Sequence, residues 1–98
     1  MITTRVTIRW QRGLHMLTAA RLVRLAQRFH SSIRLRLGTR MADARSILSL
    51  MLLSATLGTS LDIEAAGNDE HEAVRAVEEF FASPTAGEDR ASEVKPGI

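Results

Sequence analysis

The chain has 98 residues, enough for one domain with a buried core, and its 45% hydrophobic and 24% charged residues are typical of a globular protein. It contains no cysteine, which excludes disulfides and thiol nucleophiles, and its three histidines are too scattered to indicate a metal site. The net charge of +2 is unevenly distributed, because residues 1–40 hold nine arginines and no acid while residues 41–98 carry a net charge of −7. No apolar stretch approaches the ~20 residues of a membrane span, and no signal-peptide core is present. We therefore expect a soluble, cytoplasmic protein without membrane insertion.

The patterning of apolar residues predicts a chain of short strands and helices. Strands show apolar side chains at every second position, and helices show them at a spacing of three or four. In chain order, we expect a strand over 3–10, a helix from 16 to 29 or 30, strands over 32–37 and 40–44, a helix over 47–53, a strand over 60–65 and a final helix after residue 69. This β-α-β-β-α-β-α order predicts an α+β fold, an open-faced β-sandwich in which three helices cover one face of a four-stranded antiparallel sheet.

Cap residues and core positions refine these elements. Ser46 is a predicted N-cap of the second helix, and Asp69 followed by Glu72 approximates a capping box for the third. The inward face of the third helix is predicted to consist of Ala73, Val74, Val77 and Phe81. Apolar periodicity then stops, so we expect residues 1–83 to form the domain and residues 84–98 a disordered tail.

The most informative motif is Gly13-Leu14-His15, at the junction of the first strand and the first helix. Backbone N–H groups at a helix N-terminus lack intrahelical partners, and the helix dipole favours negative charge there. A phosphoryl group on His15 would find N–H donors at residues 17 and 18, and the dipole would favour the neutral, nucleophilic imidazole. Gly13 would allow a partner's phosphate to approach closely. The alternative is that His15 is an ordinary capping or surface residue.

Further motifs continue this pattern through the chain. After the histidine motif and an apolar helix face come Arg45-Ser46-Ile47-Leu48, Gly58-Thr59, Gly67 and Asp69-Glu70. Together, these motifs resemble the HPr family, the histidine-containing phosphocarriers of the bacterial phosphotransferase system, over about residues 3–82. The resemblance implies that His15 accepts a phosphoryl group from phospho-enzyme I, which takes it from phosphoenolpyruvate, and passes it to sugar-specific A domains. Such a protein is a stoichiometric carrier rather than an enzyme, and the resemblance implies no cofactor or metal.

The active-site motif departs from the family pattern, which reads Gly-Leu-His-x-Arg-Pro-Ala. This chain has Leu17 in place of the arginine and Thr18 in place of the proline. Loss of a charge-assisted contact to the phosphoryl group would cost on the order of 1.5–3 kcal/mol. The backbone N–H groups of Leu17 and Thr18 remain as phosphate supports. We expect Arg12 or Arg24 to add positive charge, with a more diffuse contribution from Arg21.

The resemblance also implies a regulatory role for Ser46, because the matching serine is a phosphorylation site in many HPr proteins. A phosphate at a helix N-cap is stabilised by free N–H groups and by the helix dipole, and its charge would repel an acidic partner. An HPr serine kinase would then be a further partner. The alternative is that Ser46 only caps the helix.

The helix after Ser46 is more apolar than one buried face requires. We expect Leu50 and Leu53 to point into the core. In the HPr family this surface docks enzyme I and the A domains, so the resemblance implies the docking residues Leu17, Ile47, Leu48 and Met51. The alternative is a fully buried hydrophobic helix.

The basic first half has two interpretations, an anionic partner such as nucleic acid or neutralisation by acids of the second half. If the sheet has the HPr strand order 1-4-2-3, Asp62 and Glu64 lie on the same face as Arg5, Arg9, Arg34 and Arg36. We prefer neutralisation and expect no nucleic-acid partner, since few aromatic residues are available for base stacking.

Three classes of function follow from these observations. The leading hypothesis is a monomeric phosphocarrier that uses His15. The second is a regulatory HPr-like adaptor, switched by phosphorylation at Ser46, in which transfer through His15 is weak or lost. The third is an RNA-binding α+β domain that uses the basic face of the sheet.

Overall fold

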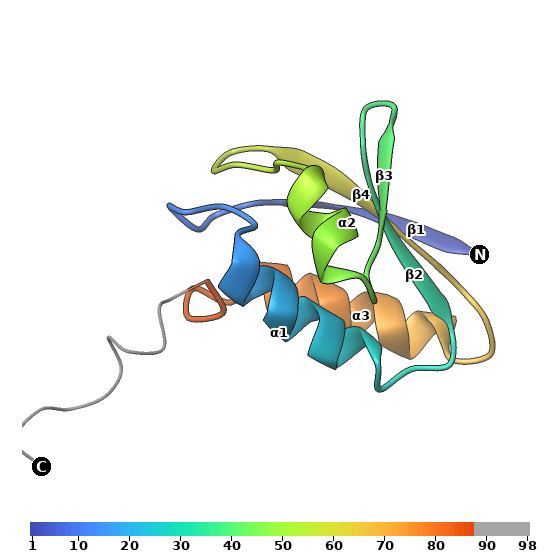
Figure 1. Cartoon of the computed structure of the whole chain (residues 1–98). Coiled ribbons are helices and arrows are strands. Elements are labelled where there is room, and N and C mark those ends of the chain that lie inside the picture. The colour runs from blue at the N-terminus through green and yellow to red at the C-terminus, as the bar shows by residue number, and fades with distance from the viewer. Residues whose placement is uncertain (88–98) are drawn as a thin grey trace, which may run out of the picture.

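The computed structural model describes residues 1–87 of the chain. Its elements, in chain order, are β1 (Ile2–Thr7), α1 (Met16–Ala26), β2 (Ser32–Leu37), β3 (Arg40–Asp43), α2 (Ile47–Leu52), β4 (Ser60–Ala66) and α3 (Glu70–Ala82) (Figure 1). This is the β-α-β-β-α-β-α order that the sequence predicts.

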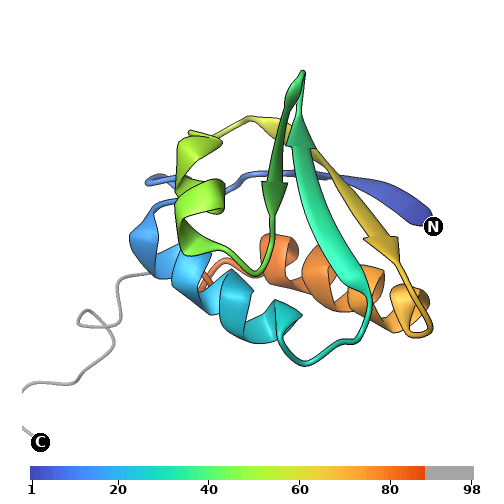
Figure 2. The same ribbon diagram turned by 45° about the vertical axis from the view of Figure 1, so that its right-hand side comes forward.

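The strands form one sheet in the order β1-β4-β2-β3, and all neighbours are antiparallel. The three helices lie together on one face of this sheet, and the other face is open (Figure 2). The last strand in the sequence therefore occupies an interior position, between β1 and β2. The predicted open-faced β-sandwich and its strand order are confirmed.

Two elements are shorter than their apolar patterns predict. β1 ends at Thr7, although Ile8 and Trp10 continue the buried alternation, because the backbone of Ile8 bonds to the loop before β4. α1 ends at Ala26 instead of near Phe29. The residues that follow close the helix with tighter bonds to carbonyls three residues earlier, such as Phe29 N–H to the Ala26 oxygen at 3.2 Å.

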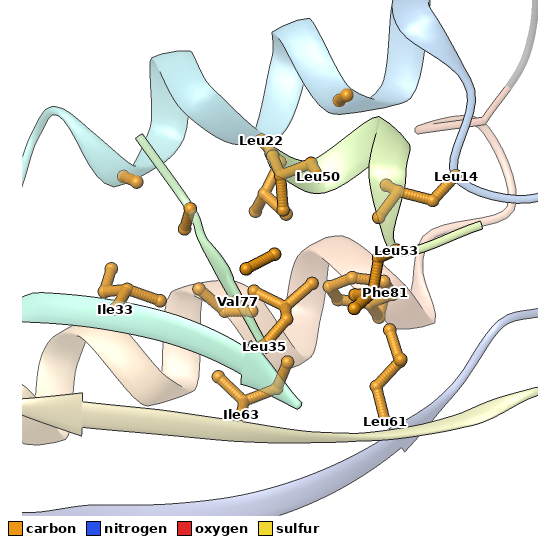
Figure 3. Packing of buried hydrophobic residues seen from close by; sticks show 14 of the residues in the cluster. Leu14, Leu22, Ile33, Leu35, Leu50, Leu53, Leu61, Ile63, Val77 and Phe81 are labelled. Carbon is orange, nitrogen blue, oxygen red and sulfur yellow. The ribbon is translucent and has the colours of Figure 1, made fainter. Parts of the chain in front are cut away.

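The helices and the inner face of the sheet enclose one hydrophobic core (Figure 3). Side chains from every layer meet there, including Leu22, Ile33, Leu35, Leu50, Leu53, Leu61, Ile63, Val77 and Phe81. The predicted inward face of α3 is buried in full, and Leu50 and Leu53 are the inward residues at the α2 end of the core. Exclusion of so much apolar surface from water supplies the main stabilising free energy of the fold.

An aromatic cluster closes the core at its C-terminal end. The ring of Trp10 stacks on Phe81 with centroids 5.2 Å apart, and its Nε1 donates to the Ser83 carbonyl at 2.8 Å. The guanidinium of Arg21 donates to the Ala86 carbonyl at 2.6 Å, so residues 84–87 form a turn against the domain. The predicted tail from residue 84 stays a prediction: its first four residues are described as this turn, and residues 88–98 lie outside the described part of the chain.

Asp69 is the N-cap residue of α3, but its side chain bonds to the loop before β2 instead of the first turn of the helix. Its carboxylate accepts the backbone N–H groups of His30 at 2.9 Å and Ser31 at 2.8 Å, and the Ser31 hydroxyl at 2.5 Å. It makes no side-chain cap on α3, so the predicted capping box is wrong. Gly67 lies close to the same serine, since a Cβ there would come within 2.7 Å of the Ser31 Cα. These contacts tie the loop between α1 and β2 to the start of α3.

We predict that Asp69 makes the fold sensitive to acid. The Ser31 hydroxyl and the His30 N–H lower the pKa of Asp69 from 3.8 to about 2. A lowered folded-state pKa adds stability above the unfolded value, and that stability is lost as pH falls through the folded value. Thermal denaturation at pH 7, 4 and 2 should show the wild type losing stability between pH 4 and 2. Asp69→Ala should be less stable than the wild type at pH 7 and should lose less stability between pH 4 and pH 2.

The matched control for this prediction is Glu79→Gln, at an exposed position on α3. This variant should keep the wild-type loss of stability between pH 4 and 2. An Asp69→Ala protein with the same pH dependence as the wild type would contradict the assignment.

Candidate functional site

His15 is the N-cap of α1. Its backbone is extended, with φ −99° and ψ −173°, and its carbonyl accepts the N–H of Ala19 at 2.8 Å to begin the helix. The imidazole turns back over the first turn, where the Leu17 N–H donates to Nδ1 at 3.2 Å. The ring thus occupies the place where an anion at a helix N-terminus would bind.

The two ring nitrogens of His15 have different surroundings. Nδ1 accepts a hydrogen bond from Leu17, so in the neutral ring the proton resides on Nε2. Nε2 is buried and has no hydrogen-bond partner within residues 1–87. In this conformation, only Nδ1 lies against the N–H groups of the first turn.

Thr18 completes a reciprocal capping box with the histidine. Its Oγ1 accepts the His15 N–H at 2.9 Å, and its hydroxyl lies 3.2 Å from the carbonyl oxygen of Gly13. The sequence predicts a role for the backbone of this residue. The structure adds a side-chain role, which the family motif does not suggest because its proline has no hydroxyl.

Gly13 serves packing within the chain. It has a φ of +68°, and a Cβ at this position would come 2.5 Å from the carbonyl oxygen of Ala55. The adjacent Leu14 N–H donates to the same oxygen at 2.9 Å. The missing side chain of Gly13 thus admits the backbone that follows α2, and the close approach of a partner's phosphate stays a prediction.

The predicted auxiliary arginines lie at different places around α1. Arg12 and Arg24 are exposed, and Arg24 is two helical turns, roughly 10 Å, beyond Leu17. Arg21 directs its guanidinium at the carbonyls of Thr85 and Ala86. The first turn of α1 holds no acidic residue, so no negative side chain in it opposes an anion at His15.

Ser46 is the N-cap of α2, as predicted. Its Oγ accepts the Ser49 N–H at 3.1 Å, and the residue is half-buried. The neighbouring Arg45 donates to the backbone carbonyls of Ala26 and Phe29. This contact stabilises the C-terminal end of α1 by placing a cation on its last carbonyls. The sequence pattern gives no sign of it, because the partners lie 16 and 19 residues away.

An apolar patch covers the outer side of α2 and the start of α1. It consists of Met16, Leu17, Ile47, Leu48, Met51 and Leu52. Leu48 is 68% exposed and Met51 37%, which overturns the alternative of a fully buried helix. Leu17 is half-buried, and α2 packs beside the first half of α1 (Figures 1 and 2). Sequence reasoning missed Met16 and Leu52, at 63% and 67% exposure, although each adjoins a predicted docking residue.

The outer face of the sheet carries paired charges. Arg5 donates to Asp62 at 2.9 Å and thereby lowers the pKa of that carboxyl, and Arg36 forms an ion pair with Glu64. Both acids belong to β4, between strands that carry the arginines. The pairs support neutralisation as the explanation of the basic first half.

The comparisons with known proteins identify the family of the chain. A family model described as "PTS HPr component phosphorylation site" matches residues 2–83. The chain belongs to the HPr family of phosphocarrier proteins. It is 36% identical to phosphocarrier protein HPr of Xylella fastidiosa over 81 residues, covering 83% of this chain and 91% of the relative. It is also 36% identical to the HPr-like protein Crh of Bacillus subtilis, over 76% of this chain and 87% of the relative.

A solved structure shows the same HPr fold. The crystal structure of HPr-C-His from Thermoanaerobacter tengcongensis has a TM-score of 0.82 at 29% identity, and the match covers 91% of this chain and 99% of that one. HPr proteins are phosphoryl carriers rather than catalysts. Within residues 1–87, no helix is long and apolar enough to cross a membrane, and no cluster of His, Asp or Glu side chains is suited to a metal ion.

Proposed function

We propose that His15 accepts a phosphoryl group from phospho-enzyme I, derived from phosphoenolpyruvate, and passes it to sugar-specific A domains in the cytoplasm. The observation that carries the proposal is the place of the ring. His15 caps α1, and its Nδ1 lies on the Leu17 N–H, at the positive end of the helix dipole. A phosphoryl group on this nitrogen meets backbone donors without any rearrangement of the helix.

The transfer is a substitution at phosphorus. The Nδ1 lone pair forms the new N–P bond while the bond between phosphorus and the donor breaks, and that electron pair leaves with the donor. The proton on Nε2 stays on the ring through the step. The Leu17 N–H, released from Nδ1, then donates to a phosphoryl oxygen, and the helix dipole stabilises the negative charge.

The support for the phosphoryl group differs from the family motif. Leu17 offers a backbone N–H in place of a guanidinium, and Arg12 and Arg24 are the proposed auxiliary charges. The hydrogen bonds to the phosphoryl group come from the main chain, and the arginines act at longer range through a field that salt weakens. We therefore propose a carrier whose phosphorylated form is less stabilised than that of a protein with the full motif.

The apolar patch is the proposed docking surface for enzyme I and the A domains, with the protein acting as a monomer. The residues of the patch lie beside His15 on α1 and along α2. A partner that reaches the histidine would therefore cover the patch. An exposed apolar area with basic residues around it suits a protein partner that carries acidic groups at its rim.

Incubation with enzyme I and phosphoenolpyruvate tests the carrier function directly. We predict one acid-labile phosphoryl adduct by mass spectrometry on the wild type. The adduct should be absent from His15→Ala and retained in the matched control His71→Ala, which removes an exposed histidine on α3. A wild type that is never labelled, or a label that survives His15→Ala, would count against the proposal.

We predict that Leu17→Arg stabilises the phosphorylated form. A restored charge-assisted contact contributes about 1.5 kcal/mol, which is roughly tenfold in the transfer equilibrium. The phosphorylated fraction at equilibrium with enzyme I measures this gain, and the gain should vanish in a His15→Ala background. Equal phosphorylation of wild type and Leu17→Arg would show that other groups already supply the charge.

A second candidate function is a regulatory adaptor switched at Ser46 by an HPr serine kinase. It is favoured by the loss of the motif arginine at Leu17, together with a half-buried Ser46 at the start of the apolar patch. A phosphate on this N-cap adds about two negative charges beside the patch and repels an acidic partner without a change of fold.

We predict that Ser46→Asp weakens binding to enzyme I through charge. Titration calorimetry should show a lower affinity than for wild type, with a difference that shrinks as salt rises, while circular dichroism stays unchanged. Thr39→Asp adds the same charge in an exposed turn between β2 and β3 and should bind like wild type. Equal affinities of Ser46→Asp and wild type would remove Ser46 from the regulatory account.

A further inference from the structure

The hydroxyl of Thr18 lies beside the reacting histidine but takes no part in the transfer described above. Thr18 is in the first turn of α1 and is 0% exposed. Its Oγ1 lies 2.9 Å from the His15 backbone nitrogen, 3.2 Å from the Gly13 carbonyl oxygen and 3.0 Å from the His15 carbonyl oxygen. One hydroxyl therefore joins the loop before the histidine to the first turn of the helix.

We propose that Thr18 is a positioning residue for phosphoryl transfer. Its hydroxyl fixes the backbone of His15, so that the imidazole stays over the N–H of Leu17. The inference rests on the proposed function of His15 as phosphoryl acceptor. It adds a side-chain role for Thr18, whose hydroxyl holds the acceptor in place through the backbone of His15.

The hydrogen bonds around His15 divide between backbone and ring. The His15 N–H also reaches the Gly13 carbonyl, at 3.1 Å, within a three-residue turn. The Thr18 hydroxyl accepts from the His15 N–H and can donate to the Gly13 carbonyl, so it bonds to both groups that close the turn. The Leu17 N–H is left to Nδ1 of the ring. Rotation of the ring toward an incoming phosphoryl group then needs no movement of the backbone.

The family motif holds its histidine differently, because it has proline at this position. Proline has neither a hydroxyl nor an N–H, so it cannot form this bridge. In this chain, Leu17 offers no polar side chain to orient the ring or the phosphoryl group. The buried hydroxyl of Thr18 bonds instead to the backbone of His15. Such a bond, once formed in a buried site, is costly to remove.

The test compares Thr18→Val, which keeps the shape and removes the hydroxyl, with Thr18→Ser, which keeps the hydroxyl. Amide hydrogen exchange at Leu17 and the ¹⁵N shift of His15 Nδ1 report the ring contact without any phosphate. In Thr18→Val, the Leu17 amide should exchange about tenfold faster, and phosphorylation by enzyme I should be about fivefold slower. Thr18→Ser should lie within about twofold of wild type in both measurements.

Thr18→Ala is the second variant without a hydroxyl, and alanine favours the helical state, so it guards against a failure of Thr18→Val to fold. The positioning role is supported if a folded variant without the hydroxyl shows faster Leu17 exchange and an altered Nδ1 shift, and if Thr18→Ser recovers both. Slower phosphorylation of the same variant links this role to the transfer. Wild-type exchange and shift in folded Thr18→Val or Thr18→Ala overturn the role, even when the wild type is labelled at His15. A wild type that takes no label contradicts the proposed function separately, since the NMR signature needs no phosphoryl group.

Discussion

Burial of a single sheet face beneath three helices is the constraint on which the site depends. A four-stranded sheet with one open face is stable only when the other face is covered, and α1, α2 and α3 share that task (Figure 2). The short α2 packs on both α1 and β3. This packing brings the backbone after α2 to the start of α1, where Gly13 lies against Ala55. The position of His15 is thus a consequence of how the core is closed.

The site itself is built almost entirely from the first turn of one helix. Leu17 contributes an N–H to the ring, and Thr18 contributes a hydroxyl to the backbone of the same histidine. Main-chain donors point in fixed directions and are part of the helix, so they need no side-chain ordering. In the proposed carrier, such a site keeps its geometry without a long charged side chain, but it gives up the strongest contact to the phosphoryl group.

Two arginines of the basic first half are paired with acids of the second half on the open face of the sheet. β4 carries the acids and lies between two arginine-bearing strands, so Asp62 and Glu64 each meet a guanidinium. The exposed pair of Arg5 and Asp62 contributes little stability, whereas Glu64 of the second pair is buried. The ion pairs matter more for recognition, because they reduce the positive potential of the open face. The apolar patch beside His15 is then the more distinctive surface.

Local pattern alone determined the order of the elements, the buried face of α3, the N-cap at Ser46 and the motif around His15. Each of these depends on residues within a few positions of one another, and helix and strand periodicity records such relations directly. The roles of other residues were decided only by tertiary structure. Asp69 looks like a helix cap, yet it binds backbone groups 38 and 39 residues away.

The same holds at the two ends of the domain. Trp10 extends the alternation of β1, yet its ring closes the core on Phe81 and binds the Ser83 carbonyl, 73 residues along the chain. Residues 84–87 have no apolar periodicity, yet Arg21 holds them in a turn against α1. A carboxylate, an indole N–H or a guanidinium bonds to whichever group the packing of the core brings close to it. Neither composition nor periodicity shows which distant residue that will be.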